Sequence, residues 1–221
     1  MFFKKTFIGV EISHQGVGTV LPVVRNGRIT LARSARCPLP LHTLNHTLRE
    51  PQVRDCAAFV KTVQEAWGSL HLSQRRVAVS LPDSAGRLVL TSLDTPCKRH
   101  CEAVEMLAWK LSKMLGADPD ELQLDFRVVG RHEDGRSDVM VVVACKPVIL
   151  QYEELFLQAG LQPFRIGLHT MNLLHLFESQ ALSEGHLVLL YDHSLAVMAF
   201  SDGRPIFCRT KTIVESENVQ S

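Results

Sequence analysis

The stretch Val139–Gly167, VMVVVACKPVILQYEELFLQAGLQPFRIG, carries the clearest secondary-structure pattern in this chain. Residues 139–144 are an unbroken and mostly β-branched apolar run, which is typical of a central strand covered on both faces. Pro147 suits the first turn of a helix, and apolar residues recur at helical spacing until Gly160 supplies a stop. Residues 163–166 then predict another strand. Because a parallel return needs a crossover helix of about this length, the stretch predicts a right-handed βαβ unit.

Upstream of this stretch, the sequence predicts an N-terminal β-meander followed by alternating helices and strands. The expected elements are strands at 6–12, 17–24 and 28–33, a helix at 53–68, strands at 76–81 and 87–93, a helix at 104–116 and a strand at 122–129. An Asn-Gly turn at residues 26–27 joins the second and third strands. Downstream, a helix around 173–177 precedes strands at 186–191, 195–200 and 205–209.

Two segments of the chain follow the same plan. FIGVEISHQGVGTVLPVVRNGRI begins at Phe7, and LVLLYDHSLAVMAFSDGRPIF begins at Leu187. Each has a strand, a short polar turn, a second strand and a turn that ends in Gly. This internal repeat predicts that the strands starting at Phe7 and Leu187 occupy equivalent places in two related sheets.

The composition excludes several classes of protein. Of 221 residues, 46% are hydrophobic and 21% are charged, with 24 Lys and Arg against 23 Asp and Glu, so neither disorder nor nucleic-acid binding is expected. Six scattered cysteines without a signal peptide indicate reduced thiols in a cytoplasm. No apolar segment approaches the ~20 residues that a membrane span needs.

Motifs of metal binding and hydrolysis are missing from the sequence. Cys97 and Cys101 lie four residues apart, but no second Cys or His pair follows at ligand spacing. The ten histidines include no HExxH arrangement, and no Gly-x-Ser-x-Gly elbow makes a serine a nucleophile. We therefore expect no metal site and no catalytic residues.

Four segments, in this order, resemble the PilM family of type IV pilus assembly and its GspL-like and FtsA-like relatives. They are RRVAVSLPDS (75–84), WKLSKMLGADPDELQLDFRVVG (109–130), VACKPVILQYEELFLQAGLQPFRIG (143–167) and LHTMNLLHLF (168–177). The resemblance covers nearly the whole chain and implies an α/β fold. The implied fold would consist of an actin-like (ribonuclease H-like) first domain, an inserted small α+β module and the truncated start of a second actin-like domain.

The resemblance also implies boundaries for these parts. The actin-like subdomain would comprise residues 1–76 and 167–184, and the inserted module residues 77–166. Residues 185–221 would be the opening hairpin of an incomplete second subdomain.

The function implied by the resemblance is that of a non-catalytic cytoplasmic scaffold of a type IV pilus or related secretion platform, peripheral to the inner membrane. Its partner would be the cytoplasmic N-terminal segment of a single-span, PilN-like inner-membrane protein. In PilM-like proteins this peptide lies in a groove between the first subdomain and the inserted module. The segments that cross between them predict Pro82, Phe164 and Leu168 as partner-binding residues.

An ATP-binding assembly protein is the alternative interpretation, with its nucleotide cleft completed by residues beyond Ser221. Actin-like nucleotide binders carry an Asp-x-Gly turn in the first hairpin of each half, where Asp serves magnesium and Gly approaches phosphate. Here the corresponding positions are Glu11, Ser13 and Asp192, and the glycine is absent from both turns. Because a Cβ at Ser13 obstructs phosphate, we expect no nucleotide cofactor and favour the scaffold.

Overall fold

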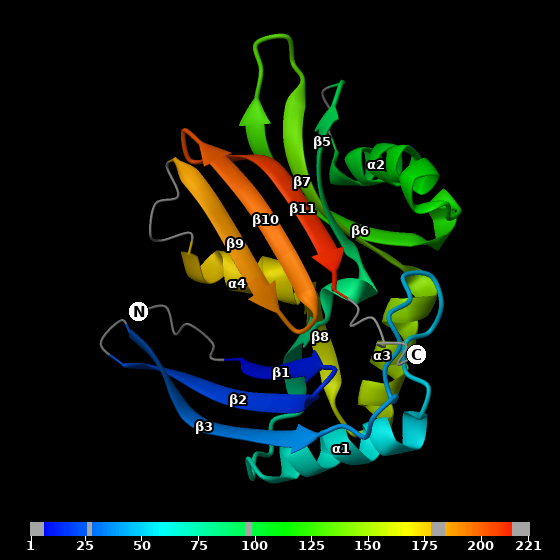
Figure 1. Ribbon diagram of the computed structural model, residues 1–221, viewed down its shortest axis with the longest axis vertical. Helices are drawn as coiled ribbons and strands as arrows, with labels where there is room; N and C mark the ends of the chain where they lie inside the picture. The colour runs from blue at the N-terminus through cyan, green and yellow to red at the C-terminus, as the bar shows by residue number, and fades with distance from the viewer. Residues whose placement is uncertain (1–6, 26–27, 96–98, 178–183, 214–221) are drawn as a thin grey trace, which may run out of the picture. The chain divides into compact units, whose positions relative to one another are not determined.

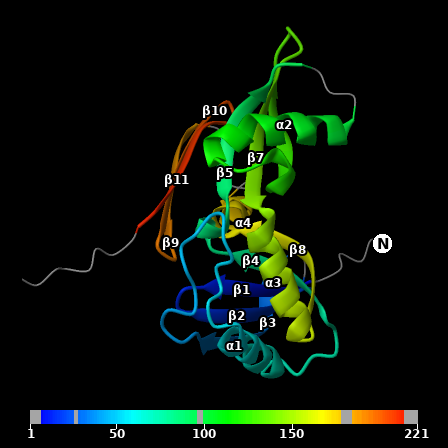
Figure 2. The same ribbon diagram turned by 90° about the vertical axis from the view of Figure 1, so that its right-hand side faces the viewer.

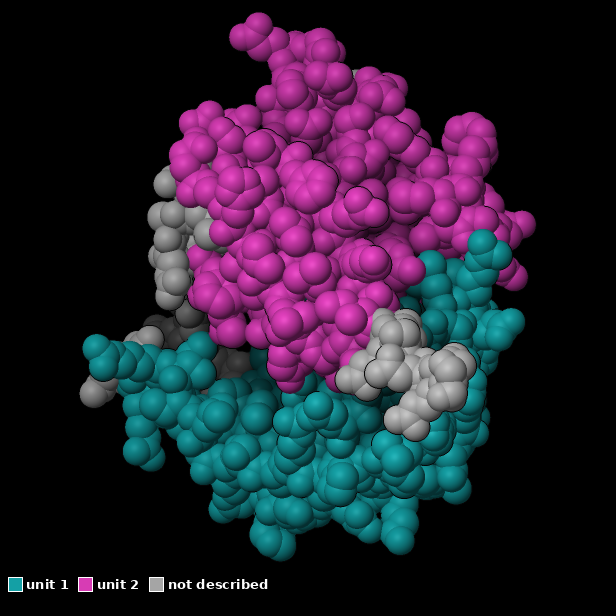
Figure 3. Space-filling view, in the orientation of Figure 1, with its two compact units in different colours: residues 1–85, 144–172 teal, residues 86–143, 173–221 magenta. Residues whose placement is uncertain are grey.

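The computed structural model describes residues 7–25, 28–95, 99–177 and 184–213, which belong to two compact units (Figure 3). The first unit consists of residues 1–85 and 144–172, and the second of residues 86–143 and 173–221. The chain therefore passes from one unit to the other three times. The predicted Asn-Gly turn at residues 26–27 and the side chain of Cys97 lie outside the described residues.

A five-stranded mixed sheet forms the centre of the first unit (Figure 1). Its strands are β1 (Ile8–Ser13), β2 (Gly16–Arg25), β3 (Arg28–Pro38), β4 (Arg76–Leu81) and β8 (Gln162–Leu168). They lie in the order β3-β2-β1-β4-β8. The first three strands form an antiparallel meander, whereas β4 pairs in parallel with both β1 and β8. The predicted N-terminal meander is confirmed.

Two helices, α1 (Cys56–Gly68) and α3 (Lys146–Gln158), lie side by side on one face of this sheet (Figure 2). Alternate apolar residues of β1 and β4 point toward these helices and are buried, namely Ile8, Val10, Ile12, Val77, Val79 and Leu81. The ring of Phe59 on α1 packs against Tyr152 and Phe156 on α3, with centroids 5.9 and 6.1 Å apart. Thr19 of β2 donates a hydrogen bond to the carbonyl of Ala66 at 3.0 Å. This layer is the core of the first unit.

The loop between β3 and α1 is fastened to α3 by two glutamine side chains. The amide of Gln151 accepts a hydrogen bond from the Val53 N–H at 2.9 Å and donates one to the Val53 carbonyl at 2.8 Å. Gln52 is buried and accepts the hydroxyl hydrogen bond of Tyr152 at 3.0 Å. Asp55 then caps α1 by accepting a backbone N–H of its first turn at 2.9 Å. The loop is therefore held by buried polar contacts.

The second unit contains a three-stranded sheet in the order β5-β7-β6 and a helix, α2. The bounds are β5 (Arg87–Leu93), α2 (His100–Leu115), β6 (Leu122–Arg131) and β7 (Ser137–Cys145), with a 3-10 turn at Pro119–Glu121. Another 3-10 turn, Asp83–Ala85, lies in the first unit, just before the chain leaves it. The helix ends at Gly116, whose φ of 61° lies in the left-handed region. The apolar run at 139–144 is the central strand of this sheet, as its pattern predicts.

A separate antiparallel sheet of the second unit contains β9 (Gly185–Tyr191), β10 (Ser194–Ser201) and β11 (Arg204–Thr212). It follows α4 (His169–Phe177), which begins in the first unit. Both hairpins turn through residues of positive φ: Asp192 and His193 at 43° and 61°, and Asp202 and Gly203 at 50° and 72°. Two such residues in succession define the type I′ turn, whose twist matches that of the strands.

The predicted internal repeat is confirmed. The β1–β2 hairpin and the β9–β10 hairpin each close through two residues. Counted from the turn, the pair of Ile12 and Val17 corresponds to the pair of Leu190 and Leu195. Each hairpin then continues into a third antiparallel strand.

The predicted βαβ unit is wrong, although its strand, helix and strand all form. The first strand, β7, pairs in the sheet of β5 and β6, whereas the second, β8, pairs in parallel with β4. The reason lies in α3, whose buried residues Tyr152 and Phe156 pack on Phe59 of α1. The chain therefore returns to the sheet beneath α1 and α3.

The pairing of β8 with β4 also gives the inserted module other boundaries than the predicted residues 77–166. Strands β4 and β8 and helix α3 fall in the first unit, so the inserted part is residues 86–143. The predicted segment 167–184 is divided as well, because the first unit ends at residue 172. Residues 184–213 belong to the same compact unit as the inserted part. An isolated strand pattern such as RVAVSL does not specify its partner, which explains the difference.

We predict that Tyr152→Phe lowers the free energy of unfolding by about 1–3 kcal/mol, because the buried oxygen of Gln52 loses its donor. The measurement is urea denaturation followed by the fluorescence of Trp67 in a Trp109→Phe background. Leu150→Ala on the exposed side of α3 is the control and should change stability far less. Equal stability of Tyr152→Phe and the parent would contradict the role of this hydrogen bond.

Candidate functional site

The face of the five-stranded sheet opposite to α1 and α3 contains a hollow of about 520 Å³. Strand register places two cross-strand rows on this face. Both rows run across β3, β2, β1, β4 and β8 in that order. The first row is Ser34, Val20, Gly9, Ala78 and Arg165. The second row is Arg36, Gly18, Glu11, Ser80 and Gly167. We call this space the sheet hollow.

The sheet hollow exists because its central positions carry small residues. Gly9, Gly18, Ala78 and Ser80 leave the backbone of three adjacent strands open. A Cβ added to Gly9 would lie 2.9 Å from a methyl carbon of Val20, so a larger residue there has no room without a shift. The volume falls in the range of pockets that hold small ligands. A ligand in the sheet hollow can therefore lie directly against the backbone of these strands.

Charged side chains stand around this small-residue floor. Arg36 on β3 and Arg165 on β8 lie at opposite ends of the two rows, and both are exposed. Glu11 lies between them, and its Oε1 is 3.9 Å from Nε2 of His169, which is only 2% exposed. Two guanidinium groups and one carboxylate leave an excess of donors. The sheet hollow is therefore suited to a ligand that presents carbonyl or carboxylate oxygens.

Polar side chains gather where β4 and β8 end. Asn172 of α4 donates a hydrogen bond to Oγ of Ser80 at 2.8 Å. The buried carboxylate of Asp83 accepts from the Thr170 N–H at 3.1 Å and from the Thr170 hydroxyl at 2.7 Å. A carboxylate at the first turn of α4 is also favoured by the helix dipole. In sheets with parallel strands, ligands bind outside the carboxyl ends of the strands, which is where these groups lie.

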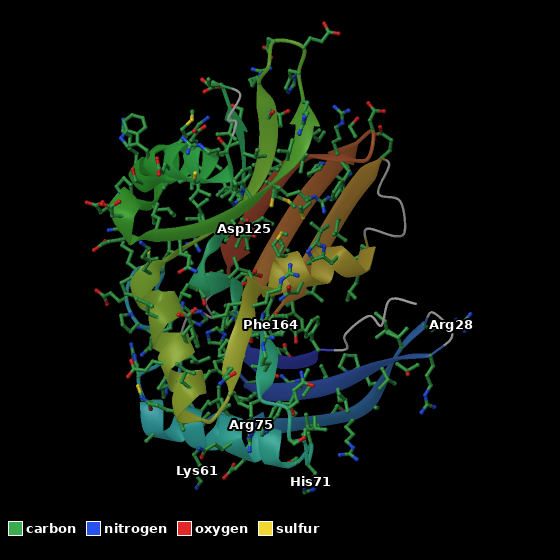
Figure 4. All side chains as sticks on the ribbon, turned by 180° about the vertical axis from the view of Figure 1, so that it is seen from behind. Arg28, Lys61, His71, Arg75, Asp125 and Phe164 are labelled. Atoms are coloured by element: carbon green, nitrogen blue, oxygen red, sulfur yellow. The ribbon has the colours of Figure 1, made fainter. Side chains whose placement is uncertain are left out.

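The three predicted partner-binding residues do not lie together. Phe164 is at the beginning of β8, where its ring is 4.5 Å from the ring of Phe7 and 5.3 Å from the guanidinium of Arg76 (Figure 4). Leu168 is at the other end of the same strand and is 4% exposed. Pro82 is buried directly after Leu81, the pairing partner of Leu168. Of the three, only Phe164 has part of its side chain accessible, and it is not a lining residue of the sheet hollow, although it precedes Arg165, which is one.

The predicted degenerate nucleotide positions are divided between the two units. Glu11 and Ser13 lie on β1, whereas Asp192 occupies the β9–β10 turn of the second unit. The Ser13 hydroxyl donates to the Gly16 carbonyl at 3.0 Å and accepts from Arg36 at 3.3 Å. The Ser13 hydroxyl is therefore engaged by hydrogen bonds to β2 and from β3.

Gly16 does not provide the open backbone that phosphate binding needs. A Cβ placed on it would lie 2.3 Å from the carbonyl oxygen of Cys37 on β3. The glycine is therefore required by the close approach of β3, and that side of the residue is filled by protein.

Several residues of the site escape prediction from the sequence. Asp83 and Thr170 each lie two residues after the end of a strand, and a polar residue at the end of a parallel strand is a usable signal. Asn172 lies further on, in the first turn of α4. Arg36 and Arg165 lie within strands and carry no such signal. Their placement beside one hollow depends on strand register.

Among the residues that the structure describes, no three His, Cys, Asp or Glu side chains gather as a metal site. No helix among them is both long and apolar enough to cross a membrane.

No protein-family model and no curated protein matches this sequence. Solved structures share its fold, which is the actin-like fold. One is a chain of the PilM–PilN type IV pilus biogenesis complex, with a TM-score of 0.79 and 20% identity over 95% of this chain. The match covers 62% of that chain. The predicted PilM-like fold is confirmed.

Two further structures support the same fold. The cytoplasmic domain of EpsL, an inner-membrane component of the type II secretion system of Vibrio cholerae, matches with a TM-score of 0.55 and 14% identity, over 94% of this chain and 71% of that one. A protein of Bacteroides thetaiotaomicron with an actin-like ATPase fold matches with a TM-score of 0.53 and 10% identity, over 96% and 72%. The predicted α/β, actin-like class is confirmed.

We predict that Asp83→Ala destabilises the first unit by about 2–4 kcal/mol, because two hydrogen bonds to a buried carboxylate are lost. Urea denaturation monitored by Trp67 fluorescence is the measurement. Asp55→Ala is the matched control, since it removes an exposed helix cap worth about 1 kcal/mol. A smaller loss for Asp83→Ala than for Asp55→Ala would contradict this assignment.

Proposed function

We propose that this chain is a non-catalytic cytoplasmic scaffold of a type IV pilus or related secretion platform at the inner membrane. It binds the cytoplasmic N-terminal segment of a single-span, PilN-like membrane protein. The fold shared with a chain of the PilM–PilN complex and with the EpsL cytoplasmic domain supports this proposal. The sheet hollow is the observation in the chain itself that carries it.

The shape and chemistry of the sheet hollow favour a peptide. Gly9, Gly18 and Ala78 let an extended segment lie close to the strands, so that its apolar side chains are removed from water. Arg36 and Arg165 are placed to donate hydrogen bonds to its carbonyl oxygens. Phe164 packs against Phe7 and precedes the lining residue Arg165, and we keep it as a partner-binding residue in the proposal.

Pro82 and Leu168 enter the proposal in a different role. Both are buried at the carboxyl ends of β4 and β8, next to the Asp83–Thr170 hydrogen bonds. They shape the strand ends that border the hollow. Substitutions for testing the site are better placed at exposed positions, because a charge at Leu168 would disrupt the core.

Modest affinity is sufficient for this function. A short segment that buries a few hundred Å² gains about 25 cal/mol per Å², less the cost of ordering the peptide. A partner held in the membrane in several copies binds multivalently, which raises the effective affinity without further contacts. The scaffold would thus be peripheral to the membrane and held there by its partner.

The alternative, ATP binding with magnesium, has no specific support in the site. The Ser13 hydroxyl is engaged by Gly16 and Arg36, and Gly16 is packed against Cys37. We therefore propose no nucleotide cofactor and no enzymatic activity for this chain.

We predict that Arg165→Glu weakens binding of the partner's N-terminal peptide by about tenfold or more, because it replaces a donor at the edge of the hollow with a repelling charge. The probe is a synthetic peptide of the cytoplasmic N-terminal segment of a PilN-like membrane protein, and its binding is measured by fluorescence anisotropy. Ala78→Leu, which fills the floor, should weaken binding without a change of charge.

Arg75→Glu is the matched control, because Arg75 is also exposed but precedes β4 and lies outside the sheet hollow (Figure 4). Circular dichroism confirms that each variant is folded. If folded Arg165→Glu and Ala78→Leu bind like the parent, the sheet hollow is not the peptide site. If the parent itself does not bind the peptide, the proposed function fails.

We predict that the chain shows no magnesium-dependent ATP hydrolysis above background and no micromolar affinity for ATP. The reason is that the Ser13 hydroxyl is hydrogen-bonded to the Gly16 carbonyl and that Gly16 is packed against β3. Isothermal titration with Mg-ATP and a phosphate-release assay are the measurements. Ser13→Gly tests whether the serine alone blocks binding. Micromolar binding by the parent chain would favour the alternative function.

A further inference from the structure

The outer part of the β2–β3 hairpin has an apolar face that is exposed. Strand register pairs Pro22 with Leu31 and Val24 with Ile29, and side chains paired in this way point to the same face. Val24 is 45% exposed, Ile29 is 73% exposed and Leu31 is 64% exposed. We call these four residues the hairpin face. None of them lines the sheet hollow, so the hairpin face is a separate surface.

Two arginines point to the other face of this hairpin end. Arg25 is paired with Arg28, next to the pair of Val24 and Ile29, and neighbouring pairs alternate between the two faces. Both arginines are exposed. Neither guanidinium has a hydrogen bond or an ion pair with a residue that the structure describes. Because like charges directly opposite each other repel, an anion beside this pair would stabilise it.

The charge of this part of the chain has one sign. Residues 12–49 contain no Asp or Glu, although the whole chain has 24 Lys and Arg against 23 Asp and Glu. The basic residues of the segment are Arg25, Arg28, Arg33, Arg36 and Arg49. Arg33 donates a hydrogen bond to the Leu70 carbonyl at 2.6 Å, and Arg36 donates one to the Ser13 hydroxyl at 3.3 Å. The two arginines at the hairpin end are therefore the ones available to an anionic partner.

The geometry of the hairpin end favours a membrane surface over a folded partner. Among the described residues, β1 pairs with β2 only as far as Val20, so the hairpin beyond it is a two-stranded ribbon. The hairpin face and the pair of Arg25 and Arg28 point in opposite directions from this ribbon. A folded protein that packs on one face leaves the other in water. Lipid surrounds an inserted hairpin end on both sides, with phosphate groups next to hydrocarbon.

Two other kinds of partner fit the hairpin end less well. A second copy would bring Arg25 and Arg28 of both chains together, which disfavours a dimer. Nucleic acid supplies phosphates, but it offers no apolar surroundings for Ile29 and Leu31. Residues 8–58 also contain no aromatic side chain on which a base could stack. An anionic lipid surface matches both the charge and the apolar residues.

We propose that the outer end of the β2–β3 hairpin makes direct contact with a membrane surface that contains anionic phospholipids. Ile29 and Leu31 enter the boundary between headgroups and acyl chains. Arg25 and Arg28 donate hydrogen bonds to lipid phosphates, which also relieves their mutual repulsion. This contact goes beyond the proposed function, in which the membrane partner alone holds the chain. It is weak by itself, because stable anchoring takes more than one signal.

The test is co-sedimentation of the full chain with vesicles, without any partner peptide. We expect more chain to sediment with equal parts of phosphatidylcholine and phosphatidylglycerol than with phosphatidylcholine alone. The double variant Arg25→Ala, Arg28→Ala should weaken this binding about tenfold or more. Lys61→Ala, Arg75→Ala is the matched control, because it removes the same charge from two exposed positions far from Arg28 (Figure 4). It should bind like the parent.

A second pair of variants tests the apolar contact. Ile29→Gln, Leu31→Gln replaces two exposed apolar side chains by uncharged ones of similar size and should weaken binding several-fold. Leu150→Gln, at a leucine that is 56% exposed on α3, is the control and should bind like the parent. Ile29→Trp in a Trp109→Phe background reports insertion directly. Its emission should shift to shorter wavelength with anionic vesicles, whereas Trp67 is buried and should not respond.

Several results would overturn the proposal. They are no sedimentation of the parent, equal sedimentation with both kinds of vesicle, or unchanged binding by the folded variant Arg25→Ala, Arg28→Ala. Binding to a DNA duplex but not to vesicles would make the partner a nucleic acid instead. A dimer that Ile29→Gln, Leu31→Gln dissociates would make it a second copy. None of these results bears on the proposed function, because that function is tested with a soluble peptide and without lipid.

Discussion

The parallel pairing of β4 with both β1 and β8 is the constraint on which the first unit depends. Parallel neighbours require crossover connections, and here α1 and α3 both lie on the same face of the sheet, where Phe59, Tyr152 and Phe156 form their contact. The opposite face is consequently left uncovered by α1 and α3, and it is bordered by the first turn of α4, where Asn172 lies. The carboxyl ends of β4 and β8 also meet at one edge, which brings Ser80 and Asn172 into contact. One pairing pattern therefore positions both the core and the candidate site.

The candidate site is defined more by what its residues lack than by reactive groups. Gly9, Gly18 and Ala78 give a floor of very small residues, and the guanidinium groups of Arg36 and Arg165 stand at its ends. Neither feature performs chemistry, but together they suit an extended segment that carries oxygen acceptors. The hairpin that would face phosphate in a nucleotide binder is instead closed by its own hydrogen bonds and by β3. The physical character of this site therefore agrees with recognition better than with catalysis.

Much of the local structure could be predicted from the sequence, because periodicity and turn residues act over short distances. The pattern of Arg76–Leu81 and of Arg87–Leu93 predicts both strands with their observed bounds. What the pattern could not specify is pairing: β8 joins β4 instead of β7, which moved the boundaries of the inserted part. The candidate site depends on this missing information, since Arg36, Glu11 and Arg165 come together only through the register of five strands. The internal repeat could be predicted from the sequence because it is recognised by comparing two local patterns with each other.

The hydrogen bonds between Asp83 and Thr170 have a mechanical consequence. Asp83 lies two residues before the chain leaves the first unit, and Thr170 lies two residues before it leaves again after residue 172. A tensile load applied to the second unit reaches the first through these connections. Because the buried carboxylate links the two segments, a pull on either one is shared between β4 and β8. Strand β4 is paired on both sides, with β1 and with the edge strand β8, so the load would enter the first unit through a strand that is held by two neighbours.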